Sequence, residues 1–437
     1  MSTSLCERRR GSRFLAFPTW VAVWLILVQS GQCQTLHTRD GIFFDAESVE
    51  ILDQGFRFAD ADGSVLCQAS LSDSDGARRL LRWGSWEGVR SRSAIWMANG
   101  SWLCGNIEFM GDSIRIASKW LEPIEIPLNQ IRGVIFEASA SKRNWLEMLS
   151  AMQSANGTAD RVWLQNGSEL SGVAQLSQSP DSIKIEVKSN GATVALDRSD
   201  VRYMIFSPAL LGPLADSREV LEVGLSDGSL LRSTGLDSSA GNVRMLLGSG
   251  VVAESIDSRR RFSKELRFLF DGRAKSNYLA EMKVAQYRHI SASSTLRWSL
   301  GVNEDVYGRP LFSHNGSTIG LVHSGLAMHS ASQVAFRWDG TPGRLLAELE
   351  FAMVTEGARP DLGRVRCKVL VARDGKLLTF YDQLLHRDGK REPSRRSVDV
   401  DVSGSQLIVL VVEEDELGAF GDHIQWLDAR VASIPNE

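Results

Sequence analysis

A short hairpin signature occurs four times within the first 232 residues of the chain, and it constrains the fold more than any other feature. It consists of Asp or Asn, then Gly, Ser, any residue and Leu. Asp-Gly and Asn-Gly pairs favour tight turns between two β-strands, because both residues tolerate a positive φ angle. A β-hairpin is therefore expected at each copy. The copies are DGSVLC (62–67), NGSWLC (99–104), NGSELS (166–171) and DGSLLR (227–232).

The second and third copies also agree downstream of the turn. DSIRI (112–116) matches DSIKI (181–185), and IPLNQIRGVIF (126–136) matches VALDRSDVRYMIF (194–206). Each of these units then holds five short, alternating strands, a number and order similar to those of Sm-like or SH3-like barrels. Closing such strands into a small barrel removes the exposed edges of an open sheet. The repeats are therefore predicted to be small, five-stranded, barrel-like units.

A short helix is expected between the second and third units. Trp145, Leu149 and Met152 recur there at helical spacing, after a serine, Ser141, that can cap a helix N-terminus. The predicted organisation is a signal peptide (1–33), a partial or degenerate β-repeat (42–90), a small β-barrel repeat (91–140), a linker helix (141–156), a small β-barrel repeat (157–212), a degenerate β-barrel repeat (218–272) and a C-terminal β-sandwich (280–434).

The N-terminus reads as an export signal. Arginines in CERRRGSR precede an apolar run from Phe14 to Val28, which Pro18 interrupts. That run is short for a membrane span, which needs about 20 residues, so a secretory signal is favoured over an uncleaved anchor. The protein is therefore expected to be secreted, periplasmic or in the cell envelope, and to contact a membrane only if the signal is uncleaved.

The charge distribution excludes one class of partner. The net charge is only −4 and the basic residues are scattered along the chain. Nucleic-acid binders concentrate Lys and Arg on one face. No nucleic acid is expected as a partner.

From about residue 275 the chain consists of many short strands joined by Gly, Asp and Asn turns, with no helical period. Typical strands are QVAFRW, RLLAELEFAMV, RVRCKVLVA and QLIVLVVEE. Such a pattern is typical of a jelly-roll β-sandwich. The fold class is therefore predicted as mainly β: tandem barrel-like repeats followed by a C-terminal jelly-roll sandwich.

Five segments of this region follow, in order, the landmarks of a known family. They are LRWSLGVNEDVYGRPL (296–311), SGLAMHSAS (324–332), the Asp374-Gly375-Lys376 hairpin, VDVDVSGSQLIVLVVEE (398–414) and GDHIQWLDARV (421–431). Over about residues 285 to 433 the chain resembles the NPCBM family of carbohydrate-binding modules.

The resemblance implies a galactose-binding-like β-sandwich that recognises glycans and has no hydrolytic activity of its own. It places the carbohydrate-binding residues at His329, Asp422, His423 and Trp426, with Asp428 in support. Sugars offer hydroxyl groups to polar side chains and an apolar face to an aromatic ring. The alternative is structural: Trp426 belongs to the core, and Asp422 and His423 only pin the last strand to the MHS loop.

One part of the chain departs from the family. Members commonly carry an acidic pair after the strand that corresponds to LLAELEF, whereas this chain has AMVTEGARPD. No cofactor is expected to be required. A structural calcium at EEDEL (413–417) is left open, because carboxylate oxygens suit that ion. A solvated loop is the other interpretation of that run.

Motifs for catalysis are missing from the sequence. There is no HExxH zinc motif, no GxSxG nucleophile elbow and no Gly-rich phosphate loop. We expect a secreted, non-catalytic protein that binds a glycan or polysaccharide through its sandwich, on a stalk of β-repeats. One alternative is an envelope scaffold that binds protein partners. Another is a weak glycoside hydrolase, since a carboxylate pair such as Glu413 and Asp422 is the minimum that reaction needs.

Overall fold

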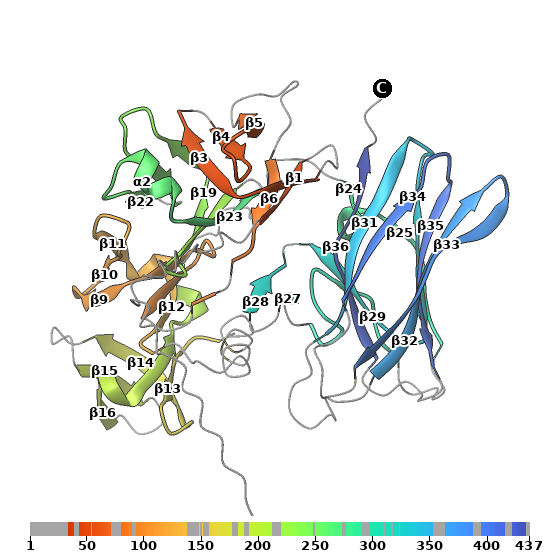
Figure 1. Cartoon of the computed structure of the whole chain (residues 1–437). Coiled ribbons are helices and arrows are strands. Elements are labelled where there is room, and N and C mark those ends of the chain that lie inside the picture. Colours follow the sequence, from red (N-terminus) through yellow and green to blue (C-terminus); the bar gives the residue numbers. More distant parts are fainter. Residues whose placement is uncertain are drawn as a thin grey trace, which may run out of the picture. The chain divides into compact units, whose positions relative to one another are not determined.

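The computed structural model describes residues 34–433, apart from the segments 39–42, 54, 71–79, 87, 90–92, 138–147, 149–150, 152–156, 177–181, 188–191, 212–219, 248–249, 273–276, 291–296, 309–310, 316–317, 323, 353–362, 388–394 and 416–421. The expected signal peptide and the AMVTEGARPD departure from Met353 onward lie outside the described residues. Figure 1 shows a chain made almost wholly of strands, so the predicted mainly β class is confirmed.

The second repeat shows how one unit is built. Its first strand pairs with the second, the second bends at Gly105, and the last returns to pair with the first. Gly105 is needed at the bend, because a Cβ there would lie 2.3 Å from the carbonyl oxygen of Ala117. The strands are β7 (Ala94–Met97), β8 (Trp102–Cys104), β9 (Asn106–Phe109), β10 (Ser113–Ala117), β11 (Ile124–Pro127) and β12 (Ile131–Ile135).

The third and fourth repeats follow the same pairing, with the last strand returning to the first. The third contains β13 (Asp160–Leu164), β14 (Glu169–Leu176), β15 (Ser182–Val187), β16 (Ala192–Asp197) and β17 (Val201–Ile205). The fourth contains β18 (Leu221–Leu225), β19 (Leu230–Ser233), β20 (Gly235–Asp237), β21 (Arg244–Leu246), β22 (Val252–Glu254), the short helix α2 (Arg259–Ser263) and β23 (Leu266–Asp271).

The first repeat begins at an earlier strand than the signature predicts. The turn at Asp62-Gly63 joins the strands β4 and β5, whereas the other three copies of the signature join a first strand to a second. The unit begins at β1, which pairs with both β2 and β6, and not at residue 42. The signature reports that a tight turn is present, but not which turn of the unit it is. The strands are β1 (Gln34–Thr38), β2 (Phe43–Ala46), β3 (Ser48–Leu52), β4 (Gly55–Ala59), β5 (Val65–Ser70) and β6 (Leu80–Gly84).

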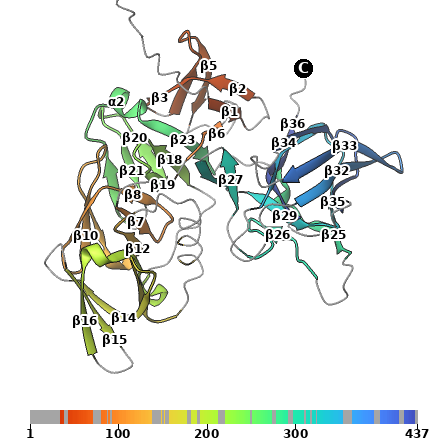
Figure 2. The ribbon, with the colours of Figure 1, turned by 60° about the horizontal axis from the view of Figure 1, so that its bottom comes forward.

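The units do not close into barrels but share one sheet of fourteen strands (Figure 2). They join by equivalent strands. The last strands β17 and β12 pair, the second strands β8 and β19 pair, and the last strands β23 and β6 pair. The remaining strands of the first, second and fourth units form three three-stranded sheets, and buried residues of these sheets and of the large sheet share one apolar core. Joining solves the edge problem that barrel closure was expected to solve.

The expected linker helix lies largely outside the described residues. Met148 and Ala151, which are described, are both helical. Met148 is buried in a second apolar cluster with Trp96 and Trp102, whose rings stack with centroids 5.2 Å apart. Within the described part of the chain, no helix has the length and apolar character that a membrane span requires.

The joint between β8 and β19 is held by two reciprocal hydrogen bonds that the signature serines accept. The Arg232 backbone N–H donates to Ser101 Oγ over 2.9 Å, and the Cys104 backbone N–H donates to Ser229 Oγ over 3.0 Å. Ser101 and Ser229 occupy the same place in their units, and both are fully buried. The two hydroxyls thus accept hydrogen bonds from backbone N–H groups of Arg232 and Cys104, next to a strand pairing that is only one residue pair long.

Ser101→Ala and Ser229→Ala are each expected to lower the free energy of unfolding by about 1–3 kcal/mol, because each leaves a buried N–H without its acceptor. The matched control is Ser168→Ala in the third unit, where the same turn is solvent-exposed and no joint forms. Chemical denaturation of the three variants measures the difference. Equal free energies of unfolding for the three variants would contradict the proposed contribution of Ser101 and Ser229 to the joint between β8 and β19.

The C-terminal region is a sandwich of two antiparallel sheets (Figure 1). One sheet runs β26-β29-β36-β31-β34, with β24 also on β36, and the other runs β25-β30-β35-β32-β33. Alternate residues of both sheets face inward and form a separate apolar core. The strands are β24 (Asn277–Tyr278), β25 (Val284–His289), β26 (Gly301–Val302), β27 (Phe312–Asn315), β28 (Thr318–Leu321), β29 (Gly325–His329), β30 (Ser332–Arg337), β31 (Gly343–Phe351), β32 (Gly363–Arg373), β33 (Lys376–Arg387), β34 (Arg396–Asp401), β35 (Leu407–Glu414) and β36 (His423–Ser433).

Candidate functional site

Two of the predicted site residues meet at one end of the sandwich. His329 ends β29 and His423 begins β36, and the two strands pair these residues directly opposite each other. Side chains opposite each other on paired strands point to the same face. The two imidazole rings therefore pack edge to face, with centroids 4.6 Å apart.

Two aromatic residues cover these imidazoles from outside the sheet. The Trp298 ring stacks on His329, with centroids 5.0 Å apart and planes inclined by 9°. Tyr307 packs against His423, and its hydroxyl lies 2.7 Å from His423 Nε2. With His289, whose ring lies 5.7 Å from that of His329, these five residues are called the imidazole–aromatic patch.

Tyr307 is presented to solvent by a tight turn. The Gly308 N–H donates to the Asp305 carbonyl oxygen over 2.9 Å, and Gly308 has a φ of 75°. Asp305 also accepts the Tyr307 N–H through Oδ1 over 2.8 Å. Asp at the start and Gly at the end are favoured in such turns. The Tyr307 side chain is 49% exposed as a result, so its ring offers an apolar face to a ligand.

The imidazoles lie behind the aromatic rings and not at the surface. His329 and His423 are each only 6% exposed. Burial lowers the pKa of His329, so this ring is neutral at pH 7. The resemblance had implied direct contact of both histidines with a sugar. Their burial corrects that role: they support Trp298 and Tyr307 from below.

Asp422 faces away from the patch. One of its carboxylate oxygens accepts the Ser330 hydroxyl over 3.0 Å, and the other accepts the Arg364 backbone N–H over 3.2 Å. Its carbonyl oxygen also accepts the Ser330 N–H over 3.2 Å. Asp422 is fully buried and pins the last strand to the loop after His329. The structural interpretation therefore fits this residue, and a sugar contact does not.

Burial raises the pKa of Asp422 to about 7, well above its ordinary value of 3.8. The folded state then holds a proton that the unfolded state releases at lower pH, so this carboxyl makes the protein lose stability as the pH rises from about 4 through 7. Asp422→Asn is expected to remove that loss, because the amide cannot ionise. Denaturation midpoints at several pH values between 4 and 8 test this, and an unchanged pH slope would contradict it.

Trp426 is part of the core. Its side chain is 0% exposed and packs between the two sheets. Alternation along β36 explains the placement, since Ile424 and Trp426 face inward while His423 and Gln425 face outward. The prediction that Trp426 binds a sugar is wrong for this reason.

Asp428 lies on the same strand, farther from the patch. It has a positive φ of 51°, at a register shift between β31 and β36. Its carboxylate forms an ion pair with Arg82. Asp428 therefore supports the backbone of its own strand and a contact with the repeats, and not the patch.

The calcium prediction finds no set of ligands among the described residues. Glu413 pairs with Lys368 over 2.6 Å, and Asp415 pairs with Arg364 over 2.5 Å. Within the described ranges no group of three or more His, Cys, Asp or Glu side chains is arranged to hold a metal ion. Glu416 and Leu417 of the EEDEL run lie outside the described residues, so a calcium ion at this run stays a prediction.

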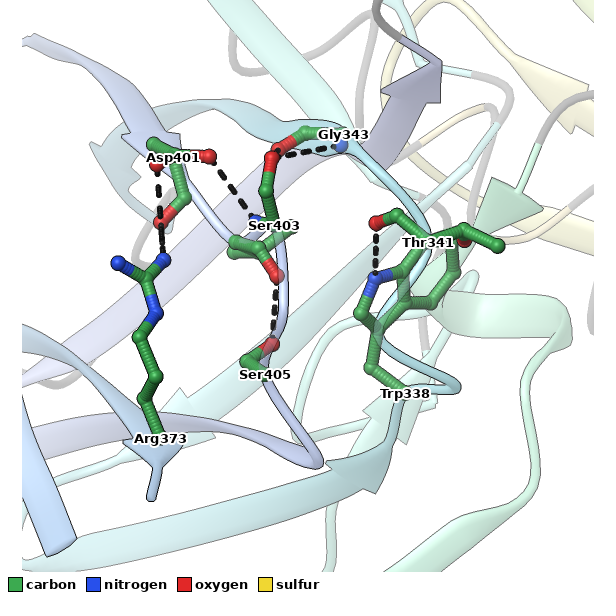
Figure 3. Close-up of polar contacts among 8 residues, drawn as sticks. Trp338, Thr341, Gly343, Arg373, Asp401, Ser403 and Ser405 are labelled. Carbon is green, nitrogen blue, oxygen red and sulfur yellow. Dashed lines mark hydrogen bonds and ion pairs between the residues drawn. The ribbon is translucent and has the colours of Figure 1, made fainter.

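The opposite end of the sandwich is occupied by its own polar contacts (Figure 3). Trp338 Nε1 donates to the Thr341 carbonyl oxygen over 3.0 Å, and Gly343 N donates to Ser403 Oγ over 3.1 Å. Arg373 lies 3.5 Å from Asp401, whose other oxygen accepts the Ser403 N–H. The polar groups of these residues are thus bonded to neighbouring loop residues of the sandwich itself. The imidazole–aromatic patch is therefore the stronger candidate for a ligand site.

Sequence reasoning missed the residues that line the surface of the patch. Trp298 and Tyr307 lie in the LRWSLGVNEDVYGRPL segment, which was used only as a landmark of the family. They are separated by more than a hundred residues of sequence from His423, so only the fold brings them together. The Asp305–Gly308 turn was the one local signal that could have marked Tyr307 as exposed.

Residues 281–432 match the family model of the NPCBM/NEW2 domain. No curated protein matches the chain. Among solved structures, the CBM51 of Clostridium perfringens GH95 in complex with methyl-galactose is 15% identical, with a TM-score of 0.29, and the match covers 36% of this chain and 99% of that chain.

Two further structures are similar. The CBM51-2 and INT domains of Clostridium perfringens ZmpB are 19% identical, with a TM-score of 0.30, over 49% of this chain and 40% of that chain. The tandem CBM51 modules of Sp3GH98, a family 98 glycoside hydrolase from Streptococcus pneumoniae, are 11% identical, with a TM-score of 0.30, over 65% of this chain and 90% of that chain. The similarity to the NPCBM/NEW2 domain family therefore covers residues 281–432 of this chain.

Proposed function

We propose that this protein binds a glycan through the imidazole–aromatic patch and does so without catalysing a reaction. The NPCBM/NEW2 match supports carbohydrate binding. The observation that carries the choice of site is the half-exposed Tyr307 ring beside Trp298, with both rings backed by imidazoles. An aromatic ring stacks on the apolar face of a sugar, while neighbouring polar groups at the edge bond its hydroxyls.

The absence of catalysis is proposed from how the carboxylates are used. Asp422 is locked by Ser330 and Arg364, and Glu413 is paired with Lys368. A glycosidase needs two carboxyl groups facing the scissile bond, one of them as a proton donor. No turnover of aryl glycosides is expected. Measurable turnover that Asp422→Asn abolishes would contradict this part of the proposal and support a weak hydrolase.

The remaining parts of the proposal concern the place of action. We infer that the arginines and the apolar run of residues 1–33 direct export to the envelope or outside the cell, and that the β-repeats carry the sandwich as a stalk. N-terminal sequencing of the protein recovered outside the cytoplasm tests the export. A protein that stays in the cytoplasm would overturn it.

A glycan array with the full chain tests the binding proposal. The wild type is expected to bind some glycan, Trp298→Ala to lose that signal, and Trp338→Ala, at the opposite end of the sandwich, to keep it. Methyl-galactose is a suitable first soluble competitor, because it is the sugar in the CBM51 complex reported above. Silence across the array together with specific capture of envelope proteins would favour the scaffold alternative.

A further inference from the structure

We propose that Tyr287 and His289 are positioning residues that fix Trp298 beside Tyr307 in the site. This inference rests on the proposed function. Residues two apart on a strand point to the same face, and Tyr287 and His289 are two apart on β25. The Tyr287 hydroxyl donates to the Trp298 carbonyl oxygen over 3.0 Å. The Trp298 N–H donates to His289 Nδ1 over 3.4 Å.

These two hydrogen bonds matter because Trp298 lies outside regular secondary structure. Residues 297–300 belong to no strand or helix, so no sheet ladder fixes the backbone there. The two side chains of β25 hold both polar groups of the Trp298 backbone instead. A tryptophan held in this way has its ring direction set before any ligand arrives, which reduces the ordering cost of binding.

The protonation pattern of His289 follows from its partners. Nδ1 accepts the Trp298 N–H, so the hydrogen of the neutral ring is on Nε2, which donates to the Ser330 carbonyl oxygen over 3.2 Å. Ser330 is itself held by Asp422. A continuous set of contacts therefore runs from the buried Asp422 through Ser330 and His289 to Trp298. Asp422, predicted from the sequence as a sugar ligand, contributes to the site only through this support.

Movement of Trp298 would disturb the whole surface of the patch. Its ring lies flat on His329, and it meets the Tyr307 ring edge to face, with centroids 5.4 Å apart and planes at 83°. A shift of the Trp298 backbone would therefore displace the ring against which Tyr307 is set. Loss of the hydrogen bonds from Tyr287 and His289 is expected to weaken binding while both rings proposed to contact the sugar, Tyr307 and Trp298, are kept.

The test uses the full chain labelled with 5-fluorotryptophan and read by fluorine NMR. The Trp298 and Trp338 resonances are assigned by replacing each residue with Phe. Tyr287→Phe, which removes only the hydroxyl, and His289→Phe, which removes the acceptor, are expected to shift or broaden the Trp298 resonance and leave that of Trp338 unchanged. His289→Asn is the rescue variant, because its Oδ1 occupies the place of Nδ1 and accepts the same N–H.

Affinity for the glycan that the array identifies is measured on the same variants. Tyr287→Phe and His289→Phe are expected to bind several-fold more weakly, and His289→Asn to bind close to the wild type. An unmoved Trp298 resonance in both Phe variants, or failure of His289→Asn to restore it, overturns the inference. The resonance is read without ligand, so a moved resonance in a protein that binds no glycan would overturn the proposed function and leave the positioning of Trp298 by Tyr287 and His289 standing.

Discussion

Tyr307→Ala is expected to weaken glycan binding about tenfold or more, because it removes the exposed stacking face of the patch. An aromatic contact is worth about 1 kcal/mol beyond the area that it buries, and about 1.4 kcal/mol corresponds to a tenfold change in affinity. The Tyr307 ring is already half-exposed, so the free energy of unfolding should change by about 1 kcal/mol or less. Isothermal titration with the glycan found on the array measures the first effect, and chemical denaturation the second.

Tyr307→Phe is the matched control for that substitution. It keeps the ring and removes only the hydroxyl that contacts His423 Nε2. A loss much smaller than that of Tyr307→Ala is expected, since stacking carries most of the contact. Wild-type affinity in Tyr307→Ala would show that the sugar does not lie on this ring.

Trp426→Ala is expected to destabilise the protein by about 3–5 kcal/mol, the cost of truncating a large aromatic side chain in a packed core. Trp426 is fully enclosed between the sheets, among residues such as Leu326 and Ile424. Chemical denaturation of the purified variant and of the wild type measures the loss in free energy of unfolding. Trp426→Phe, which leaves a smaller cavity, should lose less.

The same Trp426→Ala variant also distinguishes a role of Trp426 in the core from a role in sugar binding. If any folded Trp426→Ala protein is recovered at low temperature, its affinity for the glycan is expected to stay within a few fold of wild type. A variant of wild-type stability that no longer binds would contradict the placement of Trp426 in the core and restore it to the site.

Local patterns predicted many of the strands, because strands such as β32 alternate buried and more exposed residues, and each copy of the signature places Asp-Gly or Asn-Gly at a turn. They could not predict how the units join. Barrel closure and edge-to-edge pairing both remove free edges, and the choice depends on contacts such as Ser101 with Arg232, which are far apart in sequence. The misplaced first unit has the same cause, since Asp62-Gly63 suits either of two turns equally well.

The site was predicted in part for a related reason. His329 and His423 do meet, because β29 and β36 are neighbours in one sheet. The direction of a side chain on a strand depends on which face is buried, so Trp426 could be placed on the correct strand and yet be given the wrong role. Trp298 lies in an irregular segment that is ordered by Tyr287 and His289, and no periodic pattern marks such a segment.

The most direct test is a crystal structure of the chain grown with the glycan that the array identifies. The sugar ring is predicted to lie flat against Tyr307, at the van der Waals separation of about 4 Å, with Trp298 at its edge. A sugar bound instead among Trp338, Asp401 and Ser403, or on the β-repeats, would contradict the assignment of the imidazole–aromatic patch as the glycan-binding site.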